Sequence, residues 1–372
     1  MAFLDPAHVD VLAPNFKRRQ SGVTATVVRS VPMLARDIAI AAVAPSLPDL
    51  VPQIRLRDLL LMSRRGPSGP RVWHARRNSE MLVGLILRRL LQKDLKLLFT
   101  SASQRHHTRY SRWLIRQMDY VISTSHQSAG YLDRSSTVIP HGIDLEGFAP
   151  PRDRAVQKRH MGLPEGPVVG CFGRIRAGKG TGDFVEAMLT ALPAVPGTVA
   201  IIMGRATPKH WTYKRKLQNR IRSAGLQDRI HFLPEVPSHK IADWYKAIDL
   251  LVAPQRWEGF GLTPLEAMAC GVPVVATRVG TFQDQVIDGK TGRLIPPRDV
   301  SAMADAIRAY MENSADRASQ GKAARAHVEM AFDINHEIAG ISAVYRELLG
   351  ADGVNSNASR ARSSTSVSKV QT

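Results

Sequence analysis

Short apolar runs alternate with longer stretches of mixed polarity along most of the chain. Uninterrupted apolar runs of about four to eight residues are typical of strands buried in a parallel sheet. In the first half, such runs predict strands at Val9–Ala13, Thr24–Val28, Leu95–Thr100 and Tyr120–Ser123. In the second half, they predict strands at Val168–Phe172, Val199–Met203, Ile230–Leu233, Leu250–Ala253 and Val272–Ala276.

The stretches between these runs carry apolar residues at helical spacing. Strands that alternate with helices predict an α/β fold with parallel sheets covered on both faces. Two such series indicate two doubly wound domains, whose ligands bind at the carboxyl ends of the strands. The predicted helices are Glu80–Leu91, Phe184–Leu192, Tyr213–Ala224, Ser238–Lys246 and the stretch Ser301–Leu349, with Gly350 as its stop.

A length of 372 residues also favours two domains over one. We expect a first domain at residues 1–150 and a second at residues 151–350. The linker is placed at Phe148–Pro164, because this segment contains Pro150-Pro151 and Gly162-Leu163-Pro164. Two interpretations of the last helices stay open, since they either remain with the second domain or pack back on the first. Residues 351–372 are rich in Ser, Asn and Arg, and are expected to be disordered.

The chain is strongly basic. It carries 51 Lys and Arg against 32 Asp and Glu, and residues 1–150 hold 21 of the basic and 11 of the acidic ones. Such an excess fits nucleic acid, an anionic membrane surface or a small anionic substrate. Nucleic-acid binding is the non-enzymatic alternative. We find no zinc-ligand spacing, basic zipper or aromatic-rich RNA motif, and aromatic residues make up only 6% of the chain.

Cysteine usage and hydropathy indicate the compartment. Cys171 and Cys270 both lie inside apolar runs, so a disulfide framework is not expected and a reducing compartment fits. No stretch approaches the roughly 20 apolar residues of a spanning helix. The longest candidate, Met81–Leu91, is short and contains Arg88 and Arg89. Without a signal-peptide pattern at the N-terminus, we expect a cytoplasmic protein that can still contact a membrane surface.

The segment Trp257–Glu266 is the first candidate site. A predicted strand ends before it, and Thr263, Pro264 and Glu266 suit the N-cap, N1 and N3 positions of a following helix, which predicts a capping box. Free N–H groups at such a helix start stabilise an anion. Glu258 and Glu266 are eight residues apart and can flank that anion while they bind hydroxyl groups. A sugar nucleotide requires this combination, although a capping role alone also explains Glu266.

The segment Gly170–Gly180 is the second candidate site. A buried strand leads into a glycine-rich loop that bears Arg174 and Lys179. Glycines such as Gly173 allow a close backbone approach, and two cations can neutralise a pyrophosphate. A solvated turn is the alternative. The position of the loop at a strand's carboxyl end, in the domain that also holds both glutamates, favours the pyrophosphate.

Together these segments resemble the donor site of family 4 glycosyltransferases. The resemblance rests on Gly173-Arg174, Lys179-Gly180 and the pair Glu258 and Glu266, and it extends over about residues 9–345. It implies the GT-B fold, in which two Rossmann-like domains face a central cleft, and a retaining mechanism without a metal or other cofactor. Further segments that resemble the family are residues 138–144, 269–276 and 288–292.

The resemblance implies a role for each residue of the donor site. Arg174 and Lys179 would bind the donor diphosphate and stabilise the departing charge, which suits a site without a metal. Glu258 would contact the transferred sugar, and Glu266 the ribose. Attack on the front face of the sugar, assisted by the leaving phosphate, would explain why no nucleophile stands out. Base contacts are expected near Phe232–Val236. The backbone that holds sugar and phosphate would be Gly259, Phe260, Gly261, Leu262 and Thr263, with Gly173 nearby.

The first half departs from the family pattern. Ser21 and Gly22 stand where the family usually has a Gly-Gly pair, and residues 99–104 lack the histidine of many members. His106 and His107 follow a few residues later, as functional, capping or surface histidines. Candidates for acceptor binding are Ser21, Gly22, Arg76 and Arg77, since two arginines at a strand-to-helix edge suit a carboxylate or phosphate. A solvated face is the alternative for the arginines. Lys17-Arg18-Arg19, Arg105 and Arg109 are further basic residues that can join such a site.

These details most resemble one branch, the lipopolysaccharide core mannosyltransferases of alphaproteobacteria. Members move mannose from GDP-mannose to a Kdo residue of the lipid A-linked inner core. This resemblance implies an acidic glycolipid as acceptor and a peripheral position on the cytoplasmic face of the inner membrane. The helix predicted over Glu80–Leu91 either rests on anionic lipid or is buried with a basic end.

Two enzymatic alternatives remain. The chain can be a family 4 glycosyltransferase with another nucleotide sugar and acceptor. It can also be a nucleotide-sugar epimerase, which would need catalytic carboxylates in the first half, where there are few, and would consume its substrate without an acceptor.

Overall fold

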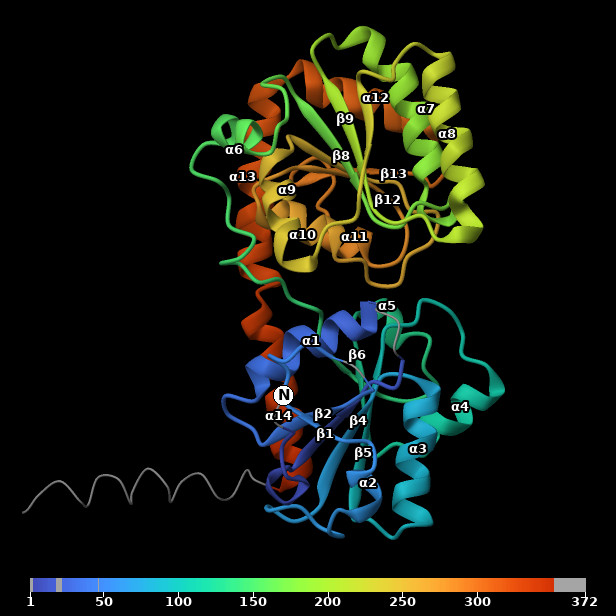
Figure 1. The fold of residues 1–372 in the computed structure, drawn as a ribbon, viewed down its shortest axis with the longest axis vertical. Coiled ribbons are helices and arrows are strands. Elements are labelled where there is room, and N and C mark those ends of the chain that lie inside the picture. The colour runs from blue at the N-terminus through green and yellow to red at the C-terminus, as the bar shows by residue number, and fades with distance from the viewer. Residues whose placement is uncertain (1–2, 18–21, 46, 351–372) are drawn as a thin grey trace, which may run out of the picture. The chain divides into compact units, whose positions relative to one another are not determined.

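A computed structural model describes residues 3–17, 22–45 and 47–350 (Figure 1). These residues form two compact units. Unit 1 ends at Pro140 and resumes at Asn335, and unit 2 spans His141–Ile334. The division therefore precedes the segment predicted as a linker, which contains helix α6 (Arg154–His160). Ser21 and the tail 351–372, which we expected to be disordered, lie outside the described residues.

Unit 1 is built on a seven-stranded sheet with the order β3-β2-β1-β4-β5-β6-β7, in which all paired strands are parallel. Its strands are β1 (Val11–Pro14), β2 (Ile40–Val43), β3 (Gln53–Ile54), β4 (Arg71–Ala75), β5 (Leu95–Ser101), β6 (Tyr120–Ser123) and β7 (Thr137–Val138). Its helices are α1 (Gly22–Leu34), α2 (Asp58–Leu61), α3 (Asn78–Arg89), α4 (Arg109–Arg116), α5 (His126–Ala129) and, from Asn335 on, α14 (Ile334–Leu349).

The strand predicted at Thr24–Val28 is wrong, because these residues belong to helix α1. The β-branched run suggested a strand, but the buried residues continue at helical spacing through Val27, Val31 and Leu34. A strand was expected before the helix that follows Arg76 and Arg77, but its bounds were not predicted, since Arg71 and His74 interrupt the apolar pattern of β4. Both side chains are buried in the structure.

His74 gives unit 1 a pH-dependent stability. Its Nδ1 lies 2.6 Å from the Tyr345 hydroxyl of α14, and its Nε2 lies 2.7 Å from the Thr100 hydroxyl. Burial, reinforced by the charge of Arg76, holds the pKa of His74 well below the usual 6.5. The folded protein therefore keeps His74 neutral, whereas the unfolded chain takes up a proton near pH 6.5. Folding stability from this residue is complete above that pH and decreases as the pH falls below it.

We expect each pH unit below 6.5 to lower the free energy of unfolding by up to about 1.4 kcal/mol through this residue. Urea unfolding at pH 7.5 and pH 5.5 measures the effect, and the variant His74→Gln should show a smaller difference between the two. An equal pH dependence in the variant and the wild type would rule out His74 as its source.

Unit 2 is built on a six-stranded parallel sheet with the order β10-β9-β8-β11-β12-β13. The strands predicted for this half are confirmed, except that the one predicted at Val272–Ala276 runs from Val274 to Thr277. The strands are β8 (Val168–Phe172), β9 (Val199–Met203), β10 (Ile230–Leu233), β11 (Leu250–Ala253), β12 (Val274–Thr277) and β13 (Gly292–Ile295). The helices are α6, α7 (Thr181–Ala191), α8 (Trp211–Ser223), α9 (Ile241–Ala247), α10 (Thr263–Ala269), α11 (Phe282–Gln285), α12 (Val300–Glu312) and α13 (Ser314–Ala331). Short 3-10 helices cover Pro6–His8 in unit 1 and, in unit 2, Ala177–Lys179, Leu192–Ala194, Pro208–His210 and Ser238–Lys240.

The strand order of unit 2 reverses direction between β8 and β11, which are neighbours. In doubly wound sheets, ligands bind beyond the carboxyl ends of the strands at such a switch point. The loops after β8 and β11 contain the two segments that the sequence singled out. The topology therefore brings both candidate segments to one edge of one sheet.

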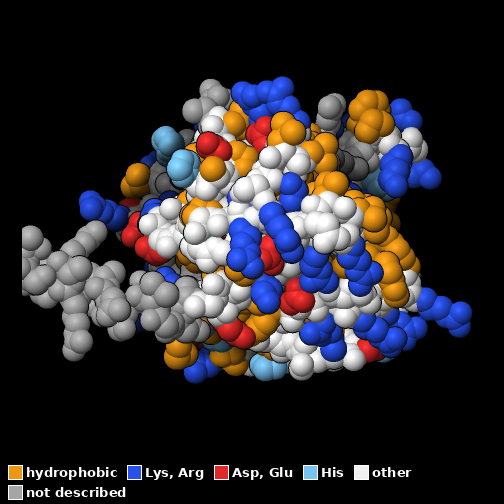
Figure 2. Space-filling view, turned by 90° about the horizontal axis from the view of Figure 1, so that it is seen from below, with side chains coloured by type: hydrophobic (Ala, Val, Ile, Leu, Met, Phe, Trp, Pro, Cys, Tyr) orange, Lys and Arg blue, Asp and Glu red, His pale blue; other side chains and the backbone are white. Residues whose placement is uncertain are grey.

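The basic excess of the chain is visible on its surface. Figure 2 shows one face of the molecule, on which Lys and Arg side chains outnumber Asp and Glu and border strips of hydrophobic side chains. Within the described part of the chain, none of the helices combines the length and the apolar character needed to cross a bilayer.

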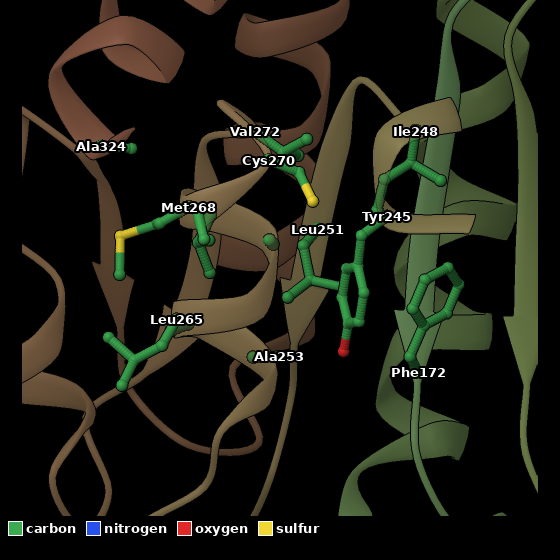
Figure 3. Close-up of a cluster of buried hydrophobic side chains, with 14 of the residues drawn as sticks. Phe172, Tyr245, Ile248, Leu251, Ala253, Leu265, Met268, Cys270, Val272 and Ala324 are labelled. Atoms are coloured by element: carbon green, nitrogen blue, oxygen red, sulfur yellow. The ribbon is translucent and has the colours of Figure 1, made fainter. Parts of the chain in front are cut away.

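A hydrophobic cluster supports the edge of the unit 2 sheet that carries the two loops. In Figure 3, the ring of Tyr245 from α9 lies between Phe172 of β8 and Leu251 of β11. The rings of Phe172 and Tyr245 are 4.8 Å apart. Cys171 and Cys270 are buried, free thiols, and burial raises the pKa of each to about 12, so neither forms a thiolate near neutral pH.

The chain enters unit 2 near Ile143 and leaves it near Ile334, and these two segments are hydrogen-bonded to each other. The Ile143 N–H donates to the Phe332 carbonyl at 2.7 Å, and the Ile334 N–H donates to the Ile143 carbonyl at 3.0 Å. A Cβ on Gly142 would lie 2.4 Å from the Ile334 Cα, so only glycine fits there. These bonds fasten the outgoing and returning segments to each other at the border of unit 2.

Candidate functional site

The first loop of the site follows β8 and has a glycine with positive φ at each of its two ends. Gly173 has a φ of 136° and Gly180 a φ of 71°, both in the region that favours glycine. The Gly173 N–H donates to the Met203 carbonyl at 2.9 Å, which fixes the start of the loop to β9. At the other end, a Cβ on Gly180 would lie 1.7 Å from the Pro254 carbonyl oxygen. The loop therefore lies directly against the chain that leaves β11, while Arg174 is exposed on it.

Lys179 and Glu258, predicted separately from the two loops, form an ion pair. The Lys179 Nζ donates to Glu258 Oε2, and the two side chains are only 20% and 15% exposed. The other oxygen of Glu258 accepts from the Gly259 N–H at 3.0 Å. A partly buried ion pair of this kind orients both groups, and a substrate phosphate would compete with Glu258 for the Lys179 ammonium.

The second loop follows β11 and is held through its carbonyl groups. The Phe260 carbonyl accepts from the Thr281 hydroxyl at 2.5 Å and from the Gln285 amide at 3.0 Å, and the same amide reaches the Gly261 carbonyl at 3.1 Å. Among the described residues, none accepts a hydrogen bond from the backbone N–H of Phe260, Gly261 or Leu262. Successive backbone N–H groups with this freedom can bind the oxygens of a phosphate or a sugar.

The capping box predicted at Thr263 is wrong. Leu262, not Thr263, precedes the first turn of α10, with helical φ and ψ of −86° and −18°. Gly261, with a φ of 69°, turns the chain one residue earlier than predicted, so Thr263 already lies inside the helix. Its hydroxyl is buried and has no hydrogen-bond partner within the described structure.

Glu266 is oriented by a tyrosine instead. The Tyr245 hydroxyl donates to Glu266 Oε2 at 2.6 Å. Burial and the neighbouring carboxylate raise the pKa of Tyr245 well above its usual 10, so the tyrosine stays a neutral donor. The carboxylate of Glu266 is therefore fixed at the start of α10, which is compatible with binding a hydroxyl group of a ligand.

The sequence reasoning missed a second ion pair in the site, between Arg256 and Asp183. The guanidinium donates to both carboxylate oxygens, at 2.8 and 2.6 Å, and the hydrogen bond to Asp183 raises the pKa of Arg256 above its usual value. The Arg256 N–H also donates to the Gly178 carbonyl at 3.2 Å. The pair joins the first turn of α7 to the chain after β11. The two residues are 73 positions apart in the sequence. The only sequence signal for their contact is that each lies next to one of the two predicted loops.

In unit 1, the two arginines predicted to bind the acceptor have different partners. Arg77 donates to Glu80 at 2.6 Å and to the Asn15 side chain at 2.8 Å, and its side chain is only 12% exposed. Its alternative as part of a solvated face is therefore wrong. Arg76 lies on the same edge, where its guanidinium reaches the His74 carbonyl at 3.2 Å. Gly22 begins α1, and Ser21 lies outside the described residues.

Buried polar atoms that have no hydrogen-bond partner among the described residues mark the carboxyl ends of β1, β5 and β6. They are Asn15 Nδ2, Gln104 Oε1 and Thr124 Oγ1, and the sequence reasoning singled out none of them. Buried polar atoms are almost always hydrogen-bonded in proteins, so unpartnered ones often meet a ligand or water. His107, whose pKa is lowered by burial, lies nearby with its Nε2 3.4 Å from the Ser101 hydroxyl. His106 is exposed and packs on Tyr131.

No metal-binding group is found in the described residues, if such a group needs three or more His, Cys, Asp or Glu side chains. The charged groups at the carboxyl edge of the unit 2 sheet include the guanidinium and ammonium groups of the two loops and the carboxylates of Glu258, Glu266 and Asp183. The site can therefore pair cations with a diphosphate and carboxylates with sugar hydroxyls.

Comparison with known proteins agrees with this geometry. Residues 153–327 match the family model of glycosyl transferases group 1, which contains all the donor-site residues considered above. The chain is 49% identical to a lipopolysaccharide core biosynthesis mannosyltransferase of Rhizobium meliloti, over 93% of this chain and 99% of the relative. It is 47% identical to that of Rhizobium leguminosarum bv. viciae, over 93% and 98%. A structure of Anabaena HepE in complex with UDP and glucose is 20% identical, with a TM-score of 0.79, and covers 91% of this chain and 100% of that one.

The two parallel sheets and the likeness to the Anabaena structure define the GT-B fold. The chain belongs to the group 1 glycosyl transferases, within the family of the lipopolysaccharide core biosynthesis mannosyltransferases.

Proposed function

We propose that this protein transfers mannose from GDP-mannose to a Kdo residue of the lipid A-linked inner core, with retention of configuration and without a metal. One observation carries the proposal. In a chain about half identical to two core mannosyltransferases, the Lys179 ammonium contacts the Glu258 carboxylate beside the loop N–H groups of Phe260–Leu262. A nucleotide sugar needs a cation for its diphosphate and, close to that cation, a hydrogen-bond acceptor for its sugar hydroxyls.

The reaction follows from these groups. The oxygen of the acceptor hydroxyl forms a bond to the anomeric carbon on the face from which the diphosphate leaves. The bond between that carbon and the phosphate oxygen breaks, and the departing phosphate takes the hydroxyl proton. Arg174 and Lys179 stabilise the charge that develops on the leaving group, as preorganised cations do without a metal. Glu258 binds hydroxyls of the transferred sugar, and Glu266, oriented by Tyr245, binds the ribose.

The donor class has more support than the individual donor. Mannose enters through the names of the two Rhizobium relatives, whereas the Anabaena structure contains UDP and glucose. Guanine and uracil differ in their hydrogen-bonding edges, so the base must be read by side chains beyond the diphosphate site. We propose that contact near Phe232–Val236, which comprises the end of edge strand β10 and the residues after it.

The acceptor site is proposed for the carboxyl edge of the unit 1 sheet. Arg76, Arg77, Gly22 and Ser21 remain its candidates. They are joined by Asn15 Nδ2, Gln104 Oε1 and Thr124 Oγ1, for which the described part of the chain offers no hydrogen-bond partner. The 21 basic residues among the first 150 suit an acceptor with carboxylates and phosphates. Because such an acceptor is anchored in lipid, the protein is proposed to work as a peripheral protein on the cytoplasmic face of the inner membrane.

The proposal is tested by supplying GDP-mannose or UDP-glucose, with and without a Kdo–lipid A acceptor, in the presence of EDTA. We expect GDP release and a hexose mass added to the acceptor only with GDP-mannose and acceptor together. Nucleotide-sugar conversion without an acceptor would instead indicate an epimerase. Transfer from UDP-glucose alone would keep the enzyme class and overturn the donor, and activity that requires an added divalent cation would overturn metal independence.

A further inference from the structure

The outer face of α3 carries apolar side chains. Leu82, Ile86 and Leu90 are exposed and recur at positions i, i+4 and i+8, so they line one side of the helix and its end. Leu90 is the most open of them, at 74%. Met81, Leu85 and Leu87 on the opposite side are buried in the core of unit 1. The helix predicted as either buried or resting on lipid therefore has both a buried face and an apolar exposed face.

The outer face of α4 is aromatic and basic. Tyr110 and Trp113 are about half exposed, at 49% and 46%, and their rings stack 6.2 Å apart. Every exposed residue of this helix other than the two aromatics is an arginine: Arg109, Arg112 and Arg116. The buried face of the helix consists of Ser111, Leu114 and Ile115.

The two helices present these faces as one surface. The Asn78 side chain at the start of α3 donates to the Ser111 hydroxyl of α4 at 2.7 Å. At the other end, the Arg88 guanidinium donates to the Gln117 carbonyl at 3.0 Å. We call the exposed set the α3–α4 surface; it consists of Leu82, Ile86, Arg89, Leu90, Arg109, Tyr110, Arg112, Trp113 and Arg116.

The charge around this surface is almost entirely positive. Residues 82–119 contain eight Lys and Arg against two Asp and no Glu. One of the aspartates, Asp119, is paired with Arg88 on the side of the helices, at 2.7 Å. Arg112 and Arg116 share a single carboxylate, Asp133, at 3.5 and 3.8 Å. The surface therefore keeps a positive excess over its own acidic neighbours.

Exposed apolar side chains also concentrate in this unit. Of the seventeen large hydrophobic residues exposed among the described residues, twelve lie in unit 1. Those of unit 2, Trp211 and Met330 among them, lie on separate elements. Single exposed hydrophobics are ordinary, but a set on two adjoining helices marks an interaction surface.

We propose that the α3–α4 surface binds an anionic phospholipid bilayer, with Tyr110, Trp113 and the leucines at the level of the headgroups and the arginines on lipid phosphates. Tyrosine and tryptophan are enriched at membrane interfaces, and each basic residue near an anionic surface adds to the attraction. The charge complementarity favours a bilayer over an apolar protein partner. The inference rests on the proposed function in one respect: that function explains why the protein would bind a bilayer, because its acceptor is anchored there.

The test is co-sedimentation of the full-length protein with vesicles of phosphatidylcholine alone or with a fraction of phosphatidylglycerol. We expect binding to the phosphatidylglycerol vesicles that weakens in high salt. The double variants Tyr110→Ser/Trp113→Ser and Arg112→Glu/Arg116→Glu should each bind at least tenfold more weakly. Trp211→Ala is the matched control, because Trp211 is an exposed tryptophan beside the basic residues of α8, and it should bind like the wild type.

Two further measurements make the outcome decisive. Urea unfolding shows whether the variants remain folded, and transfer to a water-soluble Kdo acceptor without acyl chains should be unchanged in them. Wild-type vesicle binding in both folded double variants would overturn the proposal, as would a loss confined to Trp211→Ala. If no sugar is transferred to any acceptor, the proposed function fails, yet vesicle binding is still read independently.

Discussion

Replacing Lys179 by alanine is expected to lower kcat for sugar transfer by about a hundredfold to a thousandfold. A preorganised group that stabilises developing charge in a transition state typically contributes an effect of this size. Lys179 is held against Glu258 in a partly buried pair. When alanine replaces Lys179, no neighbouring cation can take the place of the lost ammonium group without a rearrangement of the site. Steady-state kinetics with saturating donor and acceptor measure the effect.

Glu258→Gln is the partner experiment. It keeps the shape of the side chain and its contact with the Gly259 N–H but removes the charge, so we expect a smaller loss of kcat than in Lys179→Ala and a rise in the KM for the donor. Lys216→Ala, on the exposed face of α8, is the matched control and should leave both constants unchanged. A folded Lys179→Ala protein with wild-type turnover would contradict the assignment of the donor site.

Gly180→Ala is expected to disrupt the donor site and to destabilise unit 2. The new Cβ would lie 1.7 Å from the Pro254 carbonyl oxygen, which belongs to the backbone and cannot turn aside, and the residue has a φ of 71°. The backbone conformation alone costs about 1–3 kcal/mol for a residue other than glycine. The overlap adds to this cost and moves the first loop away from the chain after β11. We therefore expect at least about 3 kcal/mol less stability in urea unfolding and loss of most transfer activity.

Gly178→Ala provides a matched control in the same loop. A Cβ at Gly178 would meet nothing within 4 Å, so stability should stay close to that of the wild type. Equal stability and activity of the two glycine variants would show that the close approach of the loops does not exist in solution.

The sequence predicted the strands of unit 2 more reliably than those of unit 1, and the reason is physical. Strands such as Val199–Met203 are covered on both faces and consist of apolar residues alone. In β4, by contrast, Arg71 is buried because it donates to the Val9 carbonyl at 2.9 Å and to the Ser63 carbonyl at 2.8 Å. Those acceptors reach Arg71 only through the tertiary fold, so the local pattern did not give the bounds of this buried strand.

The same distinction applies to the site. The glycine-rich loop and the spacing of Glu258 and Glu266 could be predicted because each involves residues that are close together in the sequence. The contact between Lys179 and Glu258 joins residues 79 positions apart, and the clamp of Arg256 on Asp183 is equally remote. The capping box failed because the positive φ of Gly261 shifts the start of α10, which residue types alone do not reveal.

The basic composition has a partial explanation in the structure. Arg174 and Lys179 serve the proposed diphosphate site, Arg71, Arg77 and Arg256 are tied to protein groups, and the arginines of α4 face outward. Nucleic acid is not needed to explain these positions.

The configuration of the product tests the central claim most directly. The enzyme, with GDP-mannose, a Kdo–lipid A acceptor and EDTA, should yield a product whose nuclear magnetic resonance spectrum shows one new α-mannosyl residue on Kdo. This is the anomer of the donor, as front-face departure and attack require. A β-mannoside, or a product without added mannose, would contradict the proposed function.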